Sequence, residues 1–328
     1  MHKPFKFKAI FFSQSFRGNS GLYVVLVVLL FVAFAAQLML GVNFFKFSNL
    51  FNIARSFSIL GVTAIGQALV IISGGLDLSV GSVISTSDVL AATLMDGRNI
   101  RIIPVTLLCL LVGATIGMFN GLLMTKRGVP AFIATLGTSI ILEGLRLIYT
   151  QGSPKGEIPQ ALRYLGRGAL LQIPLLLILF MIATLAFAIV LNKTLYGRRL
   201  YVTGSNPLSS KLSGVKTDRT VILAYMLCSA AAALSGVMLG AYTGTADNWA
   251  GQGYDLDSIA AVVLGGGVIG GGIGTVSGTV LGVIIMVILV NLSLLAQLPI
   301  QSQMFVKGLV AIGAVWMNGT KIQRKSQT

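Results

Sequence analysis

Residues 73–82 read SGGLDLSVGS and lie between two apolar runs, each of which is a candidate to cross a membrane. The segment combines Gly74 and Gly75, which interrupt a regular helix, with the carboxylate of Asp77. A charge inside a bilayer is costly, so this carboxylate indicates either a structural anchor or a polar path through the membrane. The composition and motifs of the whole chain are needed to choose between these two interpretations.

The composition of the 328-residue chain is that of a membrane protein. Hydrophobic residues make up 55% of it and charged residues 10%, whereas a soluble domain has about 25% charged residues. Uncharged runs such as 22–42 and 170–191 match the ~20 helical residues that cross the hydrocarbon core. The first run is also longer than the ~7–15 apolar residues of a signal peptide, which favours a retained span. We therefore predict an all-α integral membrane protein.

About ten transmembrane helices account for the pattern, some of them short or broken by glycine. They cover 22–42, 57–73, 78–95, 102–124, 130–150, 171–191, 220–243, 257–273, 275–296 and 303–318. With the N-terminus inside, 15 Lys and Arg residues lie in cytoplasmic segments and 7 lie in outer ones. Because positive residues concentrate in cytoplasmic loops, both termini are predicted to be cytoplasmic. We expect residues 1–328 to form a single polytopic membrane domain.

Several function classes are excluded or disfavoured. The net charge of +15 does not indicate a nucleic-acid partner, because the basic residues form short clusters between apolar runs, as in loops beside anionic lipid. His2 is the only histidine, which excludes His-dependent triads and His-ligated metal sites. The chain also has no Walker A motif. We expect no catalytic residue, metal or cofactor here, and therefore no enzyme.

The longest inner segment, 192–219, is predicted to be a cytoplasmic loop that contains a short helix. Asn206 is a preferred N-cap residue, Pro207 suits the first helical position, and Gly214 suits the end of a helix. These residues predict a helix over roughly 207–213.

This short helix has the features of a docking element. Leu208 and Leu212 lie four residues apart and so share one face. Amphipathic helices use such a face to enter a partner's groove. An ordinary solvated connector is the alternative, and the shared face favours docking.

Three motifs, in order along the chain, match the pattern of a known family. They are GGLDLSVGS at 74–82; a loop motif at Gly197, Arg198, Tyr201, Gly204, Asn206, Ser213, Gly214 and Val215; and a third at Gly251, Gly253, Tyr254, Asp255, Leu256, 259–263, Gly265 and Gly266, followed by Gly271, Gly272, Gly274, Gly278 and Thr279. In these motifs the chain resembles the membrane-spanning permease subunit of bacterial ABC importers for ribose and related monosaccharides. Glu143 departs from the pattern, since arginine is expected there.

The resemblance implies a division of labour among several proteins. The permease would form an inner-membrane pathway for a ribose-like pentose or related sugar, which a periplasmic sugar-binding protein delivers. A separate cytoplasmic ABC ATPase would supply the energy, and a second permease subunit, identical or different, would complete the assembly. The candidates for ATPase coupling are Arg198, Gly204, Asn206, Leu208, Leu212, Ser213 and Gly214. An ion-coupled secondary transporter that uses intramembrane carboxylates is the alternative.

Asp77 has two compatible interpretations. Its carboxylate is well positioned to cap the helix that follows. Irregular backbone at membrane depth is also tolerated where it lines a wet cavity, as in the broken helices of transporters. Asp77 and its neighbour Ser79 are therefore candidates for a polar kink near the cytoplasmic gate.

Four other ionisable residues fall in the outer halves of predicted spans: Asp88, Glu143, Arg146 and Lys307. Glu143 and Arg146 are three residues apart on one helical face and are expected to pair. We hypothesise that some of the four line an outward-open cavity for a hydroxyl-rich solute. The alternative for Arg146 and Lys307 is that their long side chains reach the outer interface.

Three residues in the outer loop before the eighth span are candidates for contact with the binding protein: Trp249, Tyr254 and Asp255. Trp and Tyr near the membrane surface are most often interfacial anchors, which is the alternative. Both interpretations require these residues to lie near the outer face.

Overall fold

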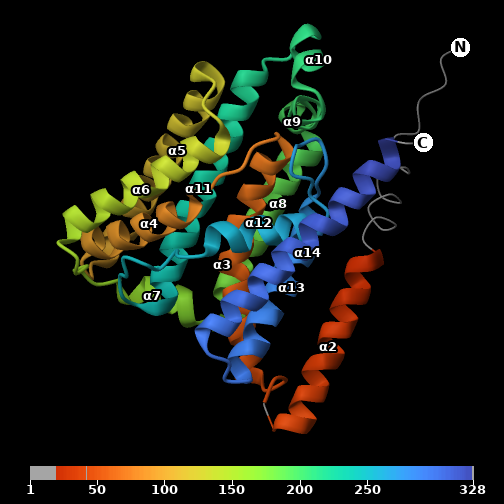
Figure 1. The fold of residues 1–328 in the computed structure, drawn as a ribbon. Coiled ribbons are helices and arrows are strands. Elements are labelled where there is room, and N and C mark those ends of the chain that lie inside the picture. Colours follow the sequence, from red (N-terminus) through yellow and green to blue (C-terminus); the bar gives the residue numbers. More distant parts are fainter. Residues whose placement is uncertain (1–19, 42, 327–328) are drawn as a thin grey trace, which may run out of the picture.

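A computed structural model gives the fold and describes residues 20–41 and 43–326 (Figure 1). The backbone in these ranges is almost entirely helical, with one short antiparallel hairpin, β1–β2. The elements are α2 (Ser20–Leu40), α3 (Phe47–Ile72), α4 (Val80–Met95), η1 (Asn99–Arg101), α5 (Ile102–Arg127), α6 (Ala131–Thr150), α7 (Gln160–Arg167), β1 (Ala169–Leu170), β2 (Ile173–Pro174), α8 (Leu175–Lys193), α9 (Leu195–Ser205), α10 (Pro207–Leu212), α11 (Thr217–Thr243), α12 (Tyr254–Leu264), α13 (Val276–Leu295) and α14 (Ile300–Ser326).

Six of the described helices are long and apolar enough to cross a membrane: α3, α5 together with η1, α6, α8, α11 and α13. Two shorter apolar helices, 22–38 and 80–95, accompany them. The prediction of an all-α chain with several membrane-crossing helices is thus confirmed. The count of ten spans stays a prediction.

The second predicted span has a different start, because α3 begins at Phe47 rather than at residue 57. The added turns contain polar residues that lower the hydropathy, but these have partners within the protein. The amide of Asn49 exchanges hydrogen bonds of 2.9 and 2.8 Å with the amide of Asn291 on α13. Such pairing lets the helix continue through a stretch that hydropathy alone assigns to a loop.

The eighth predicted span, 257–273, is wrong as a continuous helix. Helix α12 has 11 residues and ends at Leu264, so at 1.5 Å per residue it extends about 16 Å, roughly half the hydrocarbon core. Four glycines that follow have positive φ: Gly266, Gly270, Gly271 and Gly272. These left-handed conformations end the helix and form an irregular segment, 265–275, before α13.

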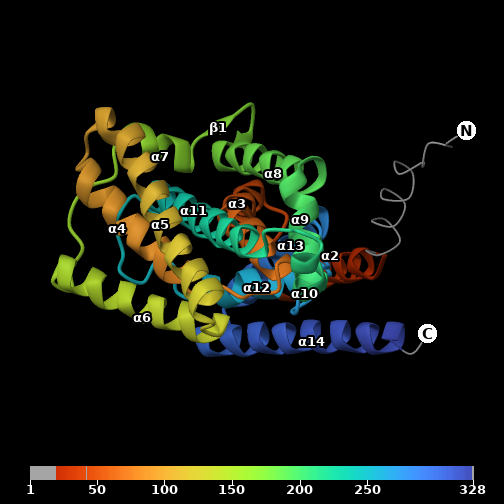
Figure 2. The same cartoon turned by 90° about the horizontal axis from the view of Figure 1, so that it is seen from above.

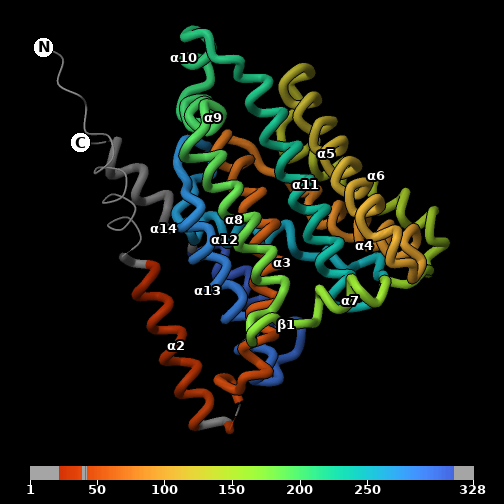
Figure 3. Tube along the Cα trace, turned by 180° about the vertical axis from the view of Figure 1, so that it is seen from behind, coloured from red at the N-terminus to blue at the C-terminus, as the bar shows by residue number. Residues whose placement is uncertain are grey.

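Helix α11 lies at the centre of the fold (Figure 2) and packs against α3, α4, α5, α7 and α9. Beside it, every residue of α3 from Ser58 to Ile72 is buried. Helices α5, α6 and α8 expose apolar side chains on the outside, as contact with lipid requires. Helices α9 and α10 lie at one end of the molecule, and α7 with the β1–β2 hairpin lies at the other (Figure 3).

Close packing at glycine joins two pairs of helices. A Cβ added to Gly113 or Gly117 of α5 would lie 2.5 or 2.2 Å from a backbone oxygen of α11. A Cβ on Gly282 of α13 would lie 1.9 Å from the carbonyl oxygen of Ala261 on α12. Helices in lipid associate through such backbone approach, because no hydrophobic effect draws them together.

Gly117→Ala should therefore destabilise the protein by about 1–3 kcal/mol, because the added methyl group meets the rigid backbone of α11. The measurement is the thermal unfolding midpoint of the purified protein in detergent. Gly144→Ala on α6 is the matched control, since nothing lies within 4 Å of its added Cβ. This control should be neutral or slightly stabilising, by up to ~1 kcal/mol; equal losses in both variants would contradict the packing argument.

Candidate functional site

The irregular segment between α3 and α4 is held by the buried carboxylate of Asp77. Its Oδ1 accepts hydrogen bonds from the backbone N–H of Ser79 at 2.9 Å and from the Ser79 hydroxyl at 2.5 Å. Its Oδ2 accepts from the hydroxyl of Ser229 on α11 at 3.3 Å. Ser79, not Asp77, occupies the N-cap position of α4. Asp77 therefore stabilises the start of α4 from two residues upstream, which corrects the expectation that it caps the helix itself.

The hydrogen bonds continue from Ser79 across two more helices. The side-chain amide of Asn120 on α5 donates to the Ser79 hydroxyl oxygen at 3.0 Å. The hydroxyl of Thr138 on α6 in turn donates to the Asn120 carbonyl oxygen at 2.6 Å. All of these side chains are buried. A satisfied buried network of this kind fixes the geometry of the elements that it joins, here the irregular segment, α5, α6 and α11.

A polar cavity of about 140 Å³ lies one turn along α4 from this network. It opens between α4, α6 and the segment that leads into α12. Its lining residues are Leu78, Gly81, Ser82, Ser85, Ser139, Glu143, Arg146, Trp249, Gly251, Gln252, Gly253 and Asp255. A cavity with several convergent polar groups and an aromatic wall is the usual form of a small-molecule site.

Close backbone contact brings the segment before α12 to α4. A Cβ on Gly81 would lie 2.7 Å from the Gly251 carbonyl oxygen, and a Cβ on Gly251 would lie 2.1 Å from that of Gly81. The Gly251 N–H also donates to the Ser85 hydroxyl at 2.8 Å. Only glycine at both positions permits this approach, so the two glycines set the width of the cavity.

Asn248 and Asp88 form further hydrogen bonds that hold the segment before α12 in place. The Asn248 amide donates to the Thr150 hydroxyl at the end of α6, at 3.1 Å, and to the Gly152 carbonyl oxygen at 3.2 Å. Asp88 on α4 accepts the backbone N–H of Asp247 at 2.9 Å. Asp88 is buried and is not among the lining residues. Of the pathway candidates it therefore positions the wall of the cavity rather than facing its interior.

Arg146 has a different environment from the one expected. It is 5% exposed and donates from Nη1 to the Ser82 carbonyl oxygen at 3.3 Å and to the Thr86 hydroxyl at 3.4 Å. Within the described ranges no ion pair joins it to Glu143, so that predicted pair is wrong. The guanidinium is hydrogen-bonded to the Ser82 carbonyl oxygen of α4 instead of the Glu143 carboxylate. The buried Arg146 side chain therefore does not extend to the membrane interface.

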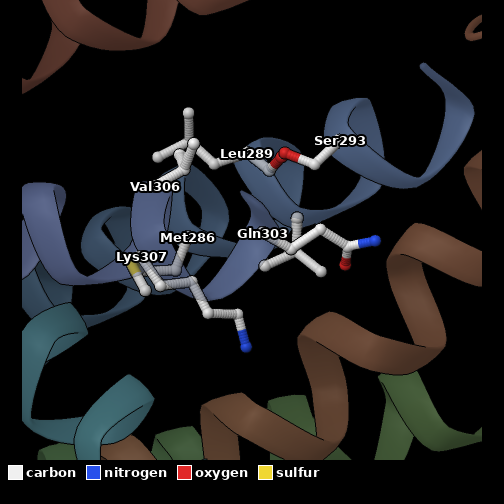
Figure 4. Close-up of a pocket in the computed structure, with 7 residues that line it drawn as sticks. Met286, Leu289, Ser293, Gln303, Val306 and Lys307 are labelled. Atoms are coloured by element: carbon white, nitrogen blue, oxygen red, sulfur yellow. The ribbon is translucent and has the colours of Figure 1, made fainter. Parts of the chain in front are cut away.

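Lys307 also has a partner inside the protein. Its ammonium group lies 2.6 Å from the Asp257 carboxylate, which ties α14 to α12. Figure 4 shows the Lys307 side chain extended away from the other residues around a crevice between α13 and α14. That crevice holds about 10 Å³, which is room for about one water molecule. It is too small to take a solute.

The structure brings together residues that the sequence placed in separate groups. Glu143 and Arg146 of the pathway group share the cavity with Trp249 and Asp255, the candidates for binding-protein contact. Tyr254 is half-buried in the apolar core beside it. Sequence reasoning missed Ser82, Ser85, Ser139 and Gln252. The spacing of serine at 79, 82 and 85, three apart on one helical face, was the available signal for two of them.

The short helix predicted over 207–213 is confirmed as α10, which ends at Leu212. The Asn206 side chain accepts the Ser209 N–H at 2.9 Å, and Pro207 begins the helix. Leu208 and Leu212 are 70% and 81% exposed. Of the other coupling candidates, Arg198, Ser213 and Gly214 are exposed as well.

Gly204, the buried coupling candidate, joins α9 to both irregular segments. A Cβ there would lie 1.8 Å from the Ile72 carbonyl oxygen at the end of α3 and 2.6 Å from the Gly272 nitrogen. The Gly272 N–H itself donates to the Ile72 oxygen at 2.9 Å. The Tyr201 hydroxyl donates to the Gly274 carbonyl oxygen at 2.8 Å. Displacement of α9 would thus act directly on the end of α3 and on segment 265–275.

Comparison with known proteins identifies the family. Residues 49–315 match the family described as branched-chain amino acid transport system / permease component. The chain belongs to this permease family. Within the described residues, no group of three or more His, Cys, Asp or Glu side chains is arranged to hold a metal ion.

Three relatives of the permease cover most of its length. The ribose import permease protein RbsC of Escherichia coli is 36% identical over 299 residues, which are 90% of this chain and 93% of that protein. RbsC of Bacillus subtilis is 37% identical over 294 residues, 89% and 91% of the two chains. The autoinducer 2 import system permease protein LsrC of Yersinia pestis is 33% identical over 308 residues, 94% and 86%. No solved structure shows significant similarity.

These relatives are import permeases rather than enzymes. The chain is accordingly a multi-pass inner membrane protein and a transport subunit. The ion-coupled secondary transporter, the alternative interpretation of the sequence, gains no support from them. The hydrogen bonds of Asp77 and Asp88 to backbone N–H groups give both carboxylates a structural task instead.

The task of Asp88 can be tested by two substitutions. Asp88→Ala removes the acceptor of the Asp247 N–H, and an unpaired buried donor costs about 1–3 kcal/mol. The variant should show faster hydrogen exchange in residues 245–253 and a lower unfolding midpoint. Asp88→Asn retains an acceptor oxygen and should keep most of the protection. An Asn variant as damaged as the Ala variant would mean that the charge, not the hydrogen bond, is what the fold needs.

Proposed function

We propose that this permease forms the translocation pathway for a monosaccharide, a ribose-like pentose or related sugar, in an ATP-driven importer. ATP hydrolysis takes place on a separate ABC ATPase that docks on α10 from the cytoplasm. A periplasmic sugar-binding protein delivers the sugar at the opposite face, and a second permease subunit completes the membrane assembly. The 33–37% identity to ribose and autoinducer 2 import permeases over most of the chain supports the substrate class.

The arrangement of α9 and α10 is the observation that carries the coupling role. The two exposed leucines of α10 form an apolar face at the end of the molecule, beyond the apolar stretches of the neighbouring helices. Behind that face, Gly204 of α9 lies against the ends of both irregular segments. A force applied to α10 by a partner therefore reaches the segments that interrupt the membrane helices. A coupling loop over 192–219 needs both properties.

The same arrangement supports one orientation in the membrane. With α10 in the cytoplasm, the basic residues of 192–219 face the side where positive loops concentrate. The cavity and the segment 244–253 then lie toward the periplasm, where Trp249 is 48% exposed. We infer that both termini are cytoplasmic, that ten helices lie in the membrane, and that Trp249 and Asp255 meet the sugar as the binding protein releases it.

The docking role of α10 is tested by Leu208→Asp combined with Leu212→Asp. The wild-type protein, purified from native membranes in mild detergent, should retain an ATPase that carries a Walker A motif, and the double variant should lose it. Two charges in an apolar interface remove its buried area and add unpaired carboxylates, which costs several kcal/mol of binding energy. Leu171→Asp, at an 89% exposed leucine of the β1–β2 hairpin, is the control and should retain the ATPase. A stable wild-type protein without any ATPase would contradict the proposal.

The energy source gives a second test. Uptake of labelled sugar by cells that express the complete importer should persist when a protonophore collapses the proton gradient and ATP is maintained. Depletion of ATP with the gradient intact should abolish it. The opposite pair of results would identify an ion-coupled carrier.

A further inference from the structure

The cavity between α4, α6 and residues 249–255 has chemistry that a simple water-filled passage does not need. Two carboxylates, Glu143 and Asp255, line it together with the guanidinium of Arg146. Three serines and a glutamine add neutral donors and acceptors. Carboxylates accept hydrogen bonds from hydroxyl groups, and a guanidinium donates up to five, so the lining complements a solute that carries several hydroxyl groups.

Arg146 supplies an unused donor at this site. Its Nη1 is engaged with α4, but its Nε is buried and has no hydrogen-bond partner among the described residues. The side chain as a whole is 95% buried, which follows from its 5% exposure. A guanidinium carries five donors, so one that has only Nη1 engaged and that lines the cavity can donate further to a solute there. The contacts with α4 also hold the guanidinium in place before a solute arrives.

Trp249 supplies the apolar surface that such a solute also requires. Its indole is half-exposed beside the cavity, and its backbone N–H donates to the Asp247 carboxylate at 3.0 Å, which orders the turn. A sugar has apolar C–H faces between its hydroxyl groups, and a flat aromatic ring packs well against such a face. The cavity of about 140 Å³ corresponds to about five water molecules at ~30 Å³ each, a volume comparable to that of a monosaccharide.

The charge of the lining sets a limit on what is accepted. Two carboxylates face one guanidinium, so the formal charge of the lining residues is negative. Like charges at short range repel strongly where water is partly excluded. An anionic solute of the same shape, such as a sugar phosphate, is therefore disfavoured by the same groups that bind its neutral counterpart.

We propose that this cavity is a solute-binding site of the permease itself, which selects neutral polyhydroxylated solutes of monosaccharide size over their phosphorylated counterparts. Glu143 and Asp255 accept from hydroxyl groups, the Arg146 guanidinium donates, and Trp249 packs against the apolar face. This inference rests on the proposed function for its substrate class. It adds that selection occurs within the membrane subunit, without the binding protein.

The test uses the fluorescence of Trp249 in the full-length protein. The chain contains two tryptophans, Trp249 and Trp316, so Trp316→Phe leaves the cavity residue as the only indole. This protein, in lipid nanodiscs without a binding protein, is titrated with D-ribose, D-xylose and D-glucose, and then with D-ribose 5-phosphate and D-glucose 6-phosphate. A saturable change is expected with at least one neutral sugar, and a Kd at least about tenfold higher with its phosphate.

Glu143→Gln in the same background should raise the Kd for the neutral sugar about tenfold and reduce the discrimination against the phosphate, because it removes one negative charge. Glu157→Gln is the matched control. Glu157 is the other glutamate of the chain and forms an ion pair with Arg163 away from the cavity, so both properties should stay unchanged. Equal effects of the two substitutions would overturn the assignment of Glu143.

Uptake by the reconstituted importer separates failure of this inference from failure of the proposed function. Sugar uptake without any saturable fluorescence change would overturn the binding site and leave the importer intact. Equal Kd values for a neutral sugar and its phosphate would overturn the selectivity. Absence of both ATP-dependent uptake and binding, with a folded protein, would remove the proposed function itself.

Discussion

Backbone groups that leave a helix inside a bilayer must find hydrogen-bond partners within the protein, because the hydrocarbon offers none. Two irregular segments of this permease, 73–79 and 265–275, are subject to that constraint. In the first segment the Asp77 carboxylate accepts the Ser79 N–H at 2.9 Å, and the Tyr225 hydroxyl donates to the Leu76 carbonyl oxygen at 3.0 Å. The Gly272 N–H donates to the Ile72 carbonyl oxygen at 2.9 Å and so ties the second segment to the end of α3, directly before the first segment. The rest of the fold is arranged around these two satisfied breaks.

Close packing at glycine is what makes those bonds reachable. Gly204 brings α9 against the end of α3, and the pair Gly81–Gly251 brings the segment before α12 against the start of α4. The first contact lies at the end of the molecule that carries α10, and the second borders the cavity. In both contacts backbone packs directly against backbone, and such packing transmits a displacement more directly than contacts between flexible side chains. The proposed coupling surface and the cavity are therefore connected through α3, the irregular segment 73–79 and α4.

The carboxylates divide into two groups by what they contact. Asp77 and Asp88 accept backbone N–H groups and are buried, so they hold irregular backbone in place. Glu143 and Asp255 line the cavity with Arg146 and face space that a solute can enter. In a membrane chain with nine acidic residues, this division explains why acidic side chains at similar depth have different tasks.

Much of the architecture followed from local sequence. Apolar runs predicted most of the helices, and Asn206 and Pro207 predicted the start of α10, because each of these signals acts within one or two turns. Two helix boundaries, the start of α3 and the end of α12, were predicted wrongly. The start of α3 depends on an amide pair with α13, 242 residues away in sequence, and α12 ends in a glycine-rich turn that hydropathy does not detect.

The candidate residues were visible in the sequence, but their grouping was not. Local spacing paired Arg146 with Glu143, whereas the tertiary structure gives the guanidinium a carbonyl of α4 and leaves Glu143 to the cavity. The meeting of α4, α6 and residues 249–255 joins positions that are 57 to 166 residues apart, and no periodicity records such a contact. Hydropathy and capping therefore determined that this chain is a helical membrane protein, and the resemblance of its three motifs to a known family indicated a permease. Only the packing of distant helices decided which of its polar residues share one site.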